Sequence, residues 1–263
     1  MNDGVGVWAV LTAAGSGTRL GAALPKALVL AGQKTLLELA VDRLAGARGM
    51  RGVVVTCPPG MEEQYLAAAT AGGATRDFVR VTAGGVSRQA SVKAGLDALR
   101  TWMTETSAGS ALVGPEVDQQ VVLVHDAARC LAPPDLMDRL TMALRLSRGG
   151  GSPDPLPVGA IPGLPVTDTI KQVAVTGVGE VVTSTPPRSS LRAIQTPQAF
   201  RMGPLFAAHE KHSHLADDEG SAATDDAALL ELEGETVVVV EGDPLAFKVT
   251  TPPDLEAVQK HVG

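Results

Sequence analysis

The first 26 residues constrain the fold most, because a short apolar segment leads directly into a loop of small residues. Residues 5–11 are mainly apolar and have the length of a buried strand. The small residues of the loop include Ala13, Ala14, Gly15 and Gly17. They let the backbone approach a ligand closely, and two cations, Arg19 and Lys26, follow. Backbone N–H groups and fixed cations together favour a polyphosphate, so the stretch predicts a phosphate-binding loop.

Two common glycine motifs do not fit this loop. A Walker A loop needs Gly-Lys-Ser/Thr at the start of a helix, and the loop has no such triplet. A G-x-G-x-x-G dinucleotide loop that starts at Gly15 would need glycine where Leu20 stands. A flexible glycine loop without a ligand remains the alternative, and the paired cations disfavour it.

Apolar runs alternate with segments of helical spacing along the first half of the chain. The runs at 52–56, 78–82 and 120–124 predict strands. The segments at 35–45, 61–71 and 87–102 predict helices, with Thr35 and Ser87 as their N-caps. Short links between such elements predict an α/β fold with a Rossmann-like, mostly parallel sheet.

The middle of the chain departs from this alternation. Residues 105–118 are small, polar and acidic and predict a surface insertion. Glycine and proline dominate residues 149–165, and residues 166–174 and 179–183 predict a two-stranded ribbon. We interpret the chain as one domain over residues 1–263, with a protruding β-arm for dimerisation within 149–190. A disordered linker is the alternative, which the recurring apolar residues disfavour.

The C-terminal part returns to the α/β pattern. A helix is predicted at 203–212, a second one capped by Thr224, and a strand at 236–240. Lys248 is expected within or just after a late short strand. His209, His212 and His214 suggest a metal cluster by composition, but we expect a solvated loop there.

Charge and composition exclude several classes of function. The net charge of −7 argues against a nucleic-acid or anionic-membrane partner. No apolar run reaches the roughly 18 residues that a membrane span needs, and the N-terminus lacks the basic region of a signal peptide. The two cysteines have no metal-ligand spacing, which favours a reducing cytoplasm.

Several polar residues follow the predicted strands, where open parallel sheets bind ligands. Gly84 and Gly85 precede Arg88 and Ser91, and Asp126 ends a buried strand. A lone carboxylate beside phosphates suits Mg²⁺, which takes one or two carboxylates and otherwise phosphate oxygens and water. An Asp that only caps the next helix is about as consistent with the strand end alone.

The motifs, taken in order, resemble the 2-C-methyl-D-erythritol 4-phosphate cytidylyltransferases. The residues that carry the resemblance are Ala13 to Leu20, Pro25-Lys26, Gly84-Gly85 with Arg88 and Ser91, Val124 to Arg129, Asp168 to Lys171, Gln195 to Gln198, Thr224 to Asp226 and Phe247 to Thr250. The resemblance spans nearly the whole chain and implies that residues 1–263 form one nucleotidyltransferase domain. It implies that the phosphate of methylerythritol 4-phosphate attacks the α-phosphorus of CTP, with magnesium, and that pyrophosphate leaves.

The resemblance also implies roles for individual residues. The implied nucleotide-binding residues are Ala13, Ala14, Gly15, Gly17, Gly84, Gly85, Arg88 and Ser91. The implied catalytic cations on the phosphates are Arg19, Lys26 and Lys248, and the implied magnesium ligand is Asp126. The implied acceptor-binding residues are Arg129 and Thr196, with Thr169 and Arg188 from the arm of a partner subunit in a homodimer. Cys130 departs from the family, which commonly has proline there, and so does Val86, where an acid is frequent.

Two other functions remain open from the sequence. One is a ribitol 5-phosphate cytidylyltransferase of the same fold, which the residues around Asp168, Thr169 and Arg188 would distinguish. The other is a nucleotide-binding regulator without catalysis, against which Arg19, Lys26 and Asp126 argue.

Overall fold

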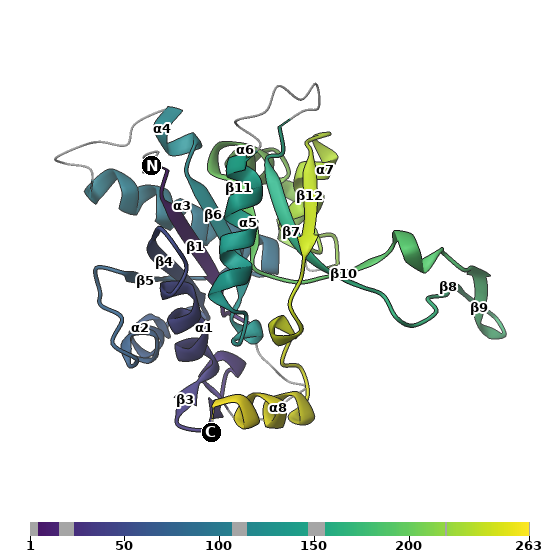
Figure 1. Ribbon diagram of the computed structural model, residues 1–263, viewed down its shortest axis with the longest axis horizontal. Helices are drawn as coiled ribbons and strands as arrows, with labels where there is room; N and C mark the ends of the chain where they lie inside the picture. Colours follow the sequence, from purple (N-terminus) through teal and green to yellow (C-terminus); the bar gives the residue numbers. More distant parts are fainter. Residues whose placement is uncertain (1–4, 16–23, 107–114, 147–155, 219, 263) are drawn as a thin grey trace.

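A single eight-stranded sheet, shown in the computed structural model of Figure 1, forms the centre of the molecule. The structure describes residues 5–15, 24–106, 115–146, 156–218 and 220–262. The strand order is β10-β7-β11-β6-β1-β4-β5, and β12 pairs with β7. The strands are β1 (Val7–Thr12), β4 (Met50–Cys57), β5 (Val79–Ala83), β6 (Val121–Asp126), β7 (Gly159–Pro165), β10 (Arg192–Ile194), β11 (Gln198–Arg201) and β12 (Val237–Glu241).

The sheet is mostly parallel, as the sequence predicts. Strand β1 pairs in parallel with β4 and β6, β4 pairs in parallel with β5, and β12 with β7. Strand β11 runs antiparallel to β6 and β7, and β10 runs antiparallel to β7. The parallel half begins with the N-terminal strand, and its strand ends point to one edge, where the cavity described below lies.

Helices cover both faces of the sheet, because successive side chains of a strand point to opposite faces. In β1, Val7, Ala9 and Leu11 belong to one apolar core, and Trp8 and Val10 to the other. The first core is covered by α1 (Leu36–Ala45), α2 (Glu62–Thr70), α5 (Pro134–Leu146) and α8 (Pro252–Val262). The second is covered by α3 (Arg88–Thr106), α6 (Met202–Lys211) and α7 (Asp226–Leu232).

Side-chain caps begin two of the predicted helices where the sequence places them. The Thr35 hydroxyl accepts a hydrogen bond from the backbone N–H of Glu38 at 3.0 Å. The Ser87 hydroxyl accepts one from Ala90 N–H at 3.0 Å, just before α3. Each cap satisfies a backbone donor that the first helical turn leaves unpaired.

Some local predictions are wrong. Strand β7 lies in the segment that glycine and proline dominate, where no strand is predicted. Helix α4 (Pro115–Asp118) occupies the end of the predicted insertion, and residues 107–114 lie outside the described part. Residues 26–28 form a turn of 3-10 helix, η2 (Lys26–Leu28). Asp225, not Thr224, caps α7 through the N–H of Ala228. Lys248 follows the 3-10 helix η6 (Pro244–Ala246) and lies in no strand.

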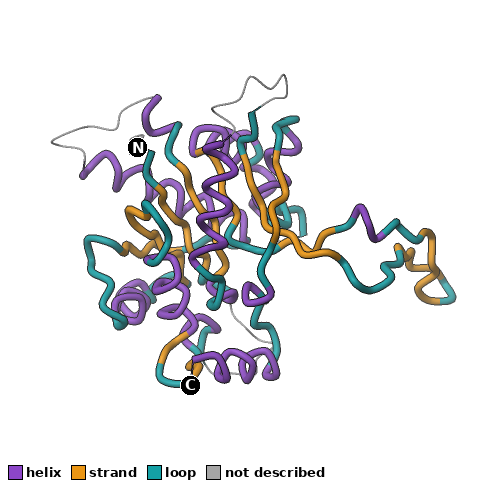
Figure 2. The backbone as a smooth tube through the Cα atoms, in the orientation of Figure 1, coloured by secondary structure: helices purple, strands orange, loops and turns teal. Residues whose placement is uncertain are grey.

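An arm leaves the sheet after β7 and returns at β10 (Figures 1 and 2). It carries the antiparallel pair β8 (Gln172–Thr176) and β9 (Gly179–Ser184) and the 3-10 turn η4 (Arg188–Ser190). All residues of β8 and β9 are exposed in the single chain. The predicted ribbon is thus present, with its first strand starting later than expected.

Among the described residues, no helix combines the length and the apolar character that crossing a bilayer requires.

Candidate active site

A cavity of about 610 Å³ lies at the carboxyl ends of β1 and β6. Ligands bind at this edge in open parallel sheets. The described residues that line it are Thr12, Ala13, Ala14, Gly15, Lys26, Ala27, Gly85, Val86, Ser87, Arg88, Ser91, Asp126, Ala127, Ala128, Lys248 and Thr250. Most of the predicted nucleotide-binding residues, two of the three predicted cations and the predicted magnesium ligand are therefore brought together. Gly17 and Arg19 lie outside the described residues.

Backbone hydrogen bonds and one buried tyrosine hold the loop after β1. The N–H of Ala13 donates to the carbonyl of Thr56 at 2.9 Å. The Tyr65 hydroxyl donates to the carbonyl of Ala13 at 3.2 Å, and its side chain is fully buried. Because the N–H and the carbonyl of Ala13 are both hydrogen-bonded within the protein, the backbone of the loop is held in a fixed position beside the cavity.

A pair of glycines lets a second backbone segment pack against this loop. A Cβ on Gly84 would lie 2.9 Å from the Cβ of Ala14 and 2.8 Å from Ser91 Oγ. A Cβ on Gly85 would overlap the Cβ of Ala90. Ser91 Oγ accepts a hydrogen bond from Gly85 N–H at 3.1 Å, so the start of α3 fixes the glycine pair. Only glycine fits these two positions without a shift of the surrounding backbone.

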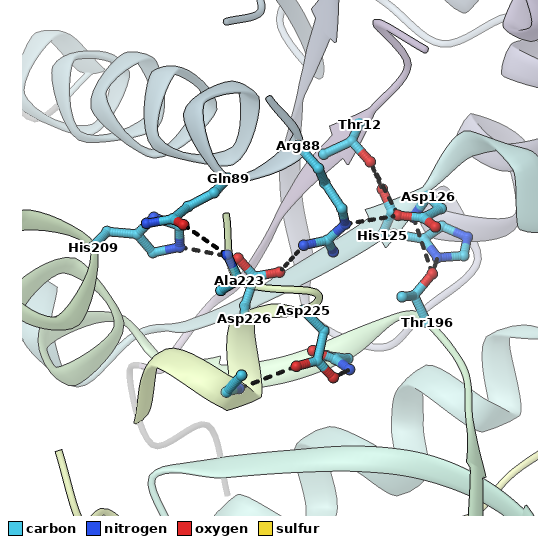
Figure 3. A network of polar contacts seen from close by, with 12 residues as sticks. Thr12, Arg88, Gln89, His125, Asp126, Thr196, His209, Ala223, Asp225 and Asp226 are labelled. Carbon is cyan, nitrogen blue, oxygen red and sulfur yellow. Dashed lines mark hydrogen bonds and ion pairs between the residues drawn. The ribbon is translucent and has the colours of Figure 1, made fainter. Parts of the chain in front are cut away.

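Asp126 is the centre of the polar groups in the cavity (Figure 3). Its Oδ1 accepts hydrogen bonds from Thr12 Oγ1 at 3.2 Å and from Arg88 Nε at 3.4 Å. Its Oδ2 accepts one from Lys248 Nζ at 2.7 Å. Thr12 and Asp126 are partners in the parallel register of β1 and β6, which explains why two strand ends 114 positions apart meet here.

The cations around Asp126 keep its carboxylate ionised. Burial alone would raise the pKa of Asp126, but the charges of Arg88 and Lys248 outweigh burial and lower this pKa well below its usual value. Burial likewise would lower the pKa of Arg88, and the carboxylates of Asp226 and Asp126 more than reverse that effect. The site therefore holds a negative charge between two fixed positive charges at neutral pH.

His125 and Thr196 hold the backbone of Asp126 in place on the side away from the cavity. Thr196 Oγ1 accepts a hydrogen bond from the N–H of Asp126 at 3.0 Å and lies 3.0 Å from His125 Nδ1. Burial lowers the pKa of His125 to about 4, so the ring is neutral near pH 7. Thr196, predicted to face the acceptor, is 6% exposed and is not among the described residues that line the cavity.

The other predicted acceptor-binding residues lie outside the cavity lining of the single chain. Arg129 Nη1 donates to the carbonyl of Ala246 at 2.7 Å, which ties the end of β6 to the segment before Lys248. Thr169 and Arg188 are exposed on the arm, where Arg188 Nη1 donates to the carbonyl of Thr167 at 2.9 Å. The structure therefore does not bring these two arm residues to their own chain's cavity.

Sequence reasoning missed several residues that build the site. Thr12 ends the first strand and lines the cavity, and Tyr65 anchors the loop. His209, expected to be solvated, is buried on α6 and contacts Asp226, which in turn contacts Arg88. Asp226 belongs to the motif Thr224 to Asp226, which pointed to this segment, but no local pattern in the sequence links that motif to a histidine in another helix.

The comparisons with known proteins agree along nearly the whole chain. The family model described as 2-C-methyl-D-erythritol 4-phosphate cytidylyltransferase matches residues 7–263. A protein of that name from Nocardia farcinica is 41% identical over 258 residues, which cover 98% of this chain and 94% of the relative. One from Streptomyces avermitilis is 44% identical over 252 residues, covering 94% and 88%.

Solved structures show the same fold. The Thermus thermophilus 2-C-methyl-D-erythritol 4-phosphate cytidylyltransferase superposes with a TM-score of 0.64 at 31% identity and covers 96% of this chain and 98% of its own. A 4-diphosphocytidyl-2C-methyl-D-erythritol synthase from Anaerococcus prevotii has a TM-score of 0.72 over 99% and 97% of the two chains. Its 24% identity supports the fold alone.

Proposed function

Because this chain belongs to the 2-C-methyl-D-erythritol 4-phosphate cytidylyltransferase family, we propose that its cavity joins the cytidylyl group of CTP to 2-C-methyl-D-erythritol 4-phosphate. Pyrophosphate is the second product, and the reaction belongs to non-mevalonate isoprenoid precursor synthesis. The observation that carries the proposal is the ionised Asp126 between Arg88 and Lys248, in a cavity walled by the backbone loop at Ala13.

The donor set fits a magnesium ion that the nucleotide brings with it. Asp126 supplies one ionised carboxylate on the cavity wall. Among the described residues, no group of three or more His, Cys, Asp or Glu side chains is placed to hold a metal alone. Mg²⁺ typically takes one or two carboxylates and completes its shell with phosphate oxygens and water. When bound, it would neutralise charge on the triphosphate.

The residues of the chain supply position and charge rather than covalent chemistry. An acceptor phosphate oxygen is already a nucleophile at neutral pH, so no general base is needed. Its bond to the α-phosphorus forms as the bond to the β-phosphate oxygen breaks, and the electron pair leaves with pyrophosphate. We assign Lys26 and Arg19 to the charge that develops on the leaving phosphates, and Lys248 to the phosphates beside Asp126.

The backbone around the cavity would hold the nucleoside. Ala14 and Gly15 on one side, and Gly85 with Ser91 on the other, would bring polar groups close to the nucleoside, while Ala13 holds the loop in place through its own backbone hydrogen bonds. Main-chain donors and acceptors can distinguish cytosine by its edge, and the ribose would lie between the two segments.

We also assign the arm to a homodimer in which each chain completes its partner's site. The arm is exposed in the single chain and carries exposed apolar side chains, including Val175 and Val178. Exposed apolar surface of this kind marks interaction sites. Thr169 and Arg188 would then bind the acceptor in the partner's cavity. The two buried free thiols, Cys57 and Cys130, suit a cytoplasmic enzyme.

A substrate panel tests the proposal. Pyrophosphate release should be fastest with CTP and methylerythritol 4-phosphate in the presence of Mg²⁺, and slow with ATP, GTP or UTP. Faster release with ribitol 5-phosphate would replace the proposed acceptor. CTP binding without release of pyrophosphate for any acceptor would instead support a non-catalytic regulator.

A further inference from the structure

Arg88 is shared unequally between two carboxylates (Figure 3). Its Nη1 lies 2.8 Å from Asp226 Oδ2, whereas its Nε lies 3.4 Å from Asp126 Oδ1. The shorter contact is therefore to Asp226, on the side of the guanidinium away from Asp126. The ion pair with Asp226 therefore leaves only a long, weak contact between Arg88 and Asp126.

Asp226 is itself held rigidly. It is the first residue of α7, and its side chain is only 1% exposed. Its second oxygen, Oδ1, lies 3.0 Å from Nε2 of His209, whose side chain is fully buried on α6. Within the described part of the chain, His209 Nδ1 has no hydrogen-bond partner, so the bond to Asp226 is the one that fixes the ring. Neither residue lines the cavity among those described.

We propose, in an inference that rests on the proposed function, that Asp226 is a positioning residue oriented by His209. Its ion pair with Arg88 limits the contact between Arg88 and Asp126 and so keeps the Asp126 carboxylate available to a divalent cation. Burial would raise the pKa of Asp226, but Arg88 and His209 outweigh burial and lower it, so the carboxylate is charged. It is the only other carboxylate that contacts Arg88 among the described ion pairs.

The cation and Arg88 compete for one carboxylate. Without the charge on Asp226, Asp126 is the carboxylate that remains in the described ion pairs of Arg88, and arginine forms strong two-pronged contacts with a carboxylate. Such a contact would occupy the oxygens that a cation needs. Groups that orient a metal ligand typically change metal affinity by about 10–100-fold when they are substituted.

The test uses Asp226→Asn, with Asp225→Asn as the matched control. The control removes the same charge one residue earlier, and asparagine caps helices about as well as aspartate. Asp225 contacts Ala228 N and Gln198 rather than Arg88. CTP binding is measured by titration calorimetry at increasing Mg²⁺, without acceptor so that no turnover occurs. The Mg²⁺ dependence of turnover with both substrates is measured in parallel.

We expect Asp226→Asn to need about 10–100-fold more Mg²⁺ than wild type in both measurements. CTP binding without Mg²⁺ should change less than threefold, and Asp226→Glu should restore much of the Mg²⁺ response. A residue that only stabilised the fold would lower kcat and the melting temperature without moving the Mg²⁺ midpoint. Equal midpoints for Asp226→Asn and Asp225→Asn would overturn the inference.

A second pair of variants keeps the inference testable if Asp226→Asn does not fold. In His209→Gln the amide nitrogen can occupy the place of Nε2 and keep the donor to Asp226, whereas in His209→Asn it reaches only the place of Nδ1. We expect His209→Asn alone to raise the Mg²⁺ midpoint several-fold. Identical midpoints for this pair would also overturn the inference. A wild-type protein without cytidylyl transfer but with Mg²⁺-dependent CTP binding would contradict the proposed function and leave this inference standing.

Discussion

Residues of the loop after β1 serve the cavity through backbone and side chain alike. Ala13 presents its backbone and is tied by Thr56 and Tyr65, while Lys26 adds a charge from the turn η2. Preorganised groups of this kind act without reorganisation during the reaction, which is why single substitutions here should have large effects.

Lys26→Ala should lower kcat by about 10²–10³-fold, which corresponds to roughly 3–4 kcal/mol of lost charge stabilisation. Lys34→Ala is the control, because Lys34 pairs with Asp42 on the surface and does not line the cavity. Steady-state pyrophosphate release measures both variants. A rate for Lys26→Ala within threefold of the control would show that this cation has no catalytic role.

Tyr65→Phe should weaken CTP binding several-fold and lower the free energy of unfolding by about 1 kcal/mol. The substitution keeps the buried ring and removes only the hydroxyl that bonds the Ala13 carbonyl. Calorimetry with CTP and urea denaturation are the two measurements. An unchanged CTP affinity, with the expected loss of stability, would mean that the loop does not depend on this anchor.

The sequence predicts the functional side chains at strand ends better than it predicts the residues that hold those side chains in position. Asp126 and Lys26 stand out because each is a charge directly beside an apolar strand or a small-residue loop. His209 and Asp226 lie in separate helices, and only the packing of α6 against α7 brings them together. No spacing rule within one element encodes such a contact.

At the scale of elements, the start of α3 and the glycine pair before it form one wall of the cavity. Gly85→Ala places a Cβ against Ala90 and should cost about 1–3 kcal/mol of strain, which we expect to appear as a raised KM for CTP. Gly177→Ala on the arm is the control, since its Cβ would meet nothing within 4 Å. Equal KM values for the two variants would show that the glycine pair does not form a wall of the CTP-binding cavity.

The arm is the element whose proposed role reaches beyond one chain. If sites are shared, mixing inactive Arg188→Ala and Asp126→Ala chains should recover up to about a quarter of wild-type activity, because half of the dimers are mixed and each has one intact site. Subunit exchange is verified by differently tagged chains. Full exchange without recovery would count against shared sites.

Strand β7 shows why some elements escape a reading of the sequence. Its segment, Gly159–Pro165, contains two prolines and two glycines, which normally indicate a loop. The strand forms because it is paired on both sides, by β11 and β10 on one and β12 on the other. These partners come later in the chain, so the local composition gives no sign of them.

At the scale of the whole molecule, the alternation of apolar strands and helices was sufficient to predict the α/β sheet and its parallel half. Each of β1, β4 and β6 is apolar on both faces, and short links leave few ways to connect them. The position of the antiparallel half depends on long-range pairing of β7, β10 and β11, which the sequence does not specify locally.

The stability of the whole fold should depend on pH through His125. Its pKa is lowered to about 4 in the folded chain, against about 6.5 when unfolded. Between these values the unfolded chain binds a proton that the folded chain does not, so stability falls as pH drops from 6.5 towards 4, by at most about 1.4 kcal/mol per pH unit. Below pH 4 this contribution no longer changes.

Urea denaturation at several pH values, with EDTA present, measures this dependence. His125→Asn, which keeps a polar but non-titrating group beside the Thr196 hydroxyl, should show a smaller slope between pH 4 and 6.5 than wild type. Parallel curves for the two proteins would mean that the slope has another source.

Isotope labelling tests most directly whether this cavity joins an acceptor phosphate to the α-phosphorus of CTP. The most direct measurement follows ¹⁸O from the phosphate of labelled methylerythritol 4-phosphate by mass spectrometry. We predict a cytidine diphosphate ester that retains all of the label, with unlabelled pyrophosphate beside it. Label in pyrophosphate, or no diphosphate ester at all in the presence of CTP and Mg²⁺, would contradict the account.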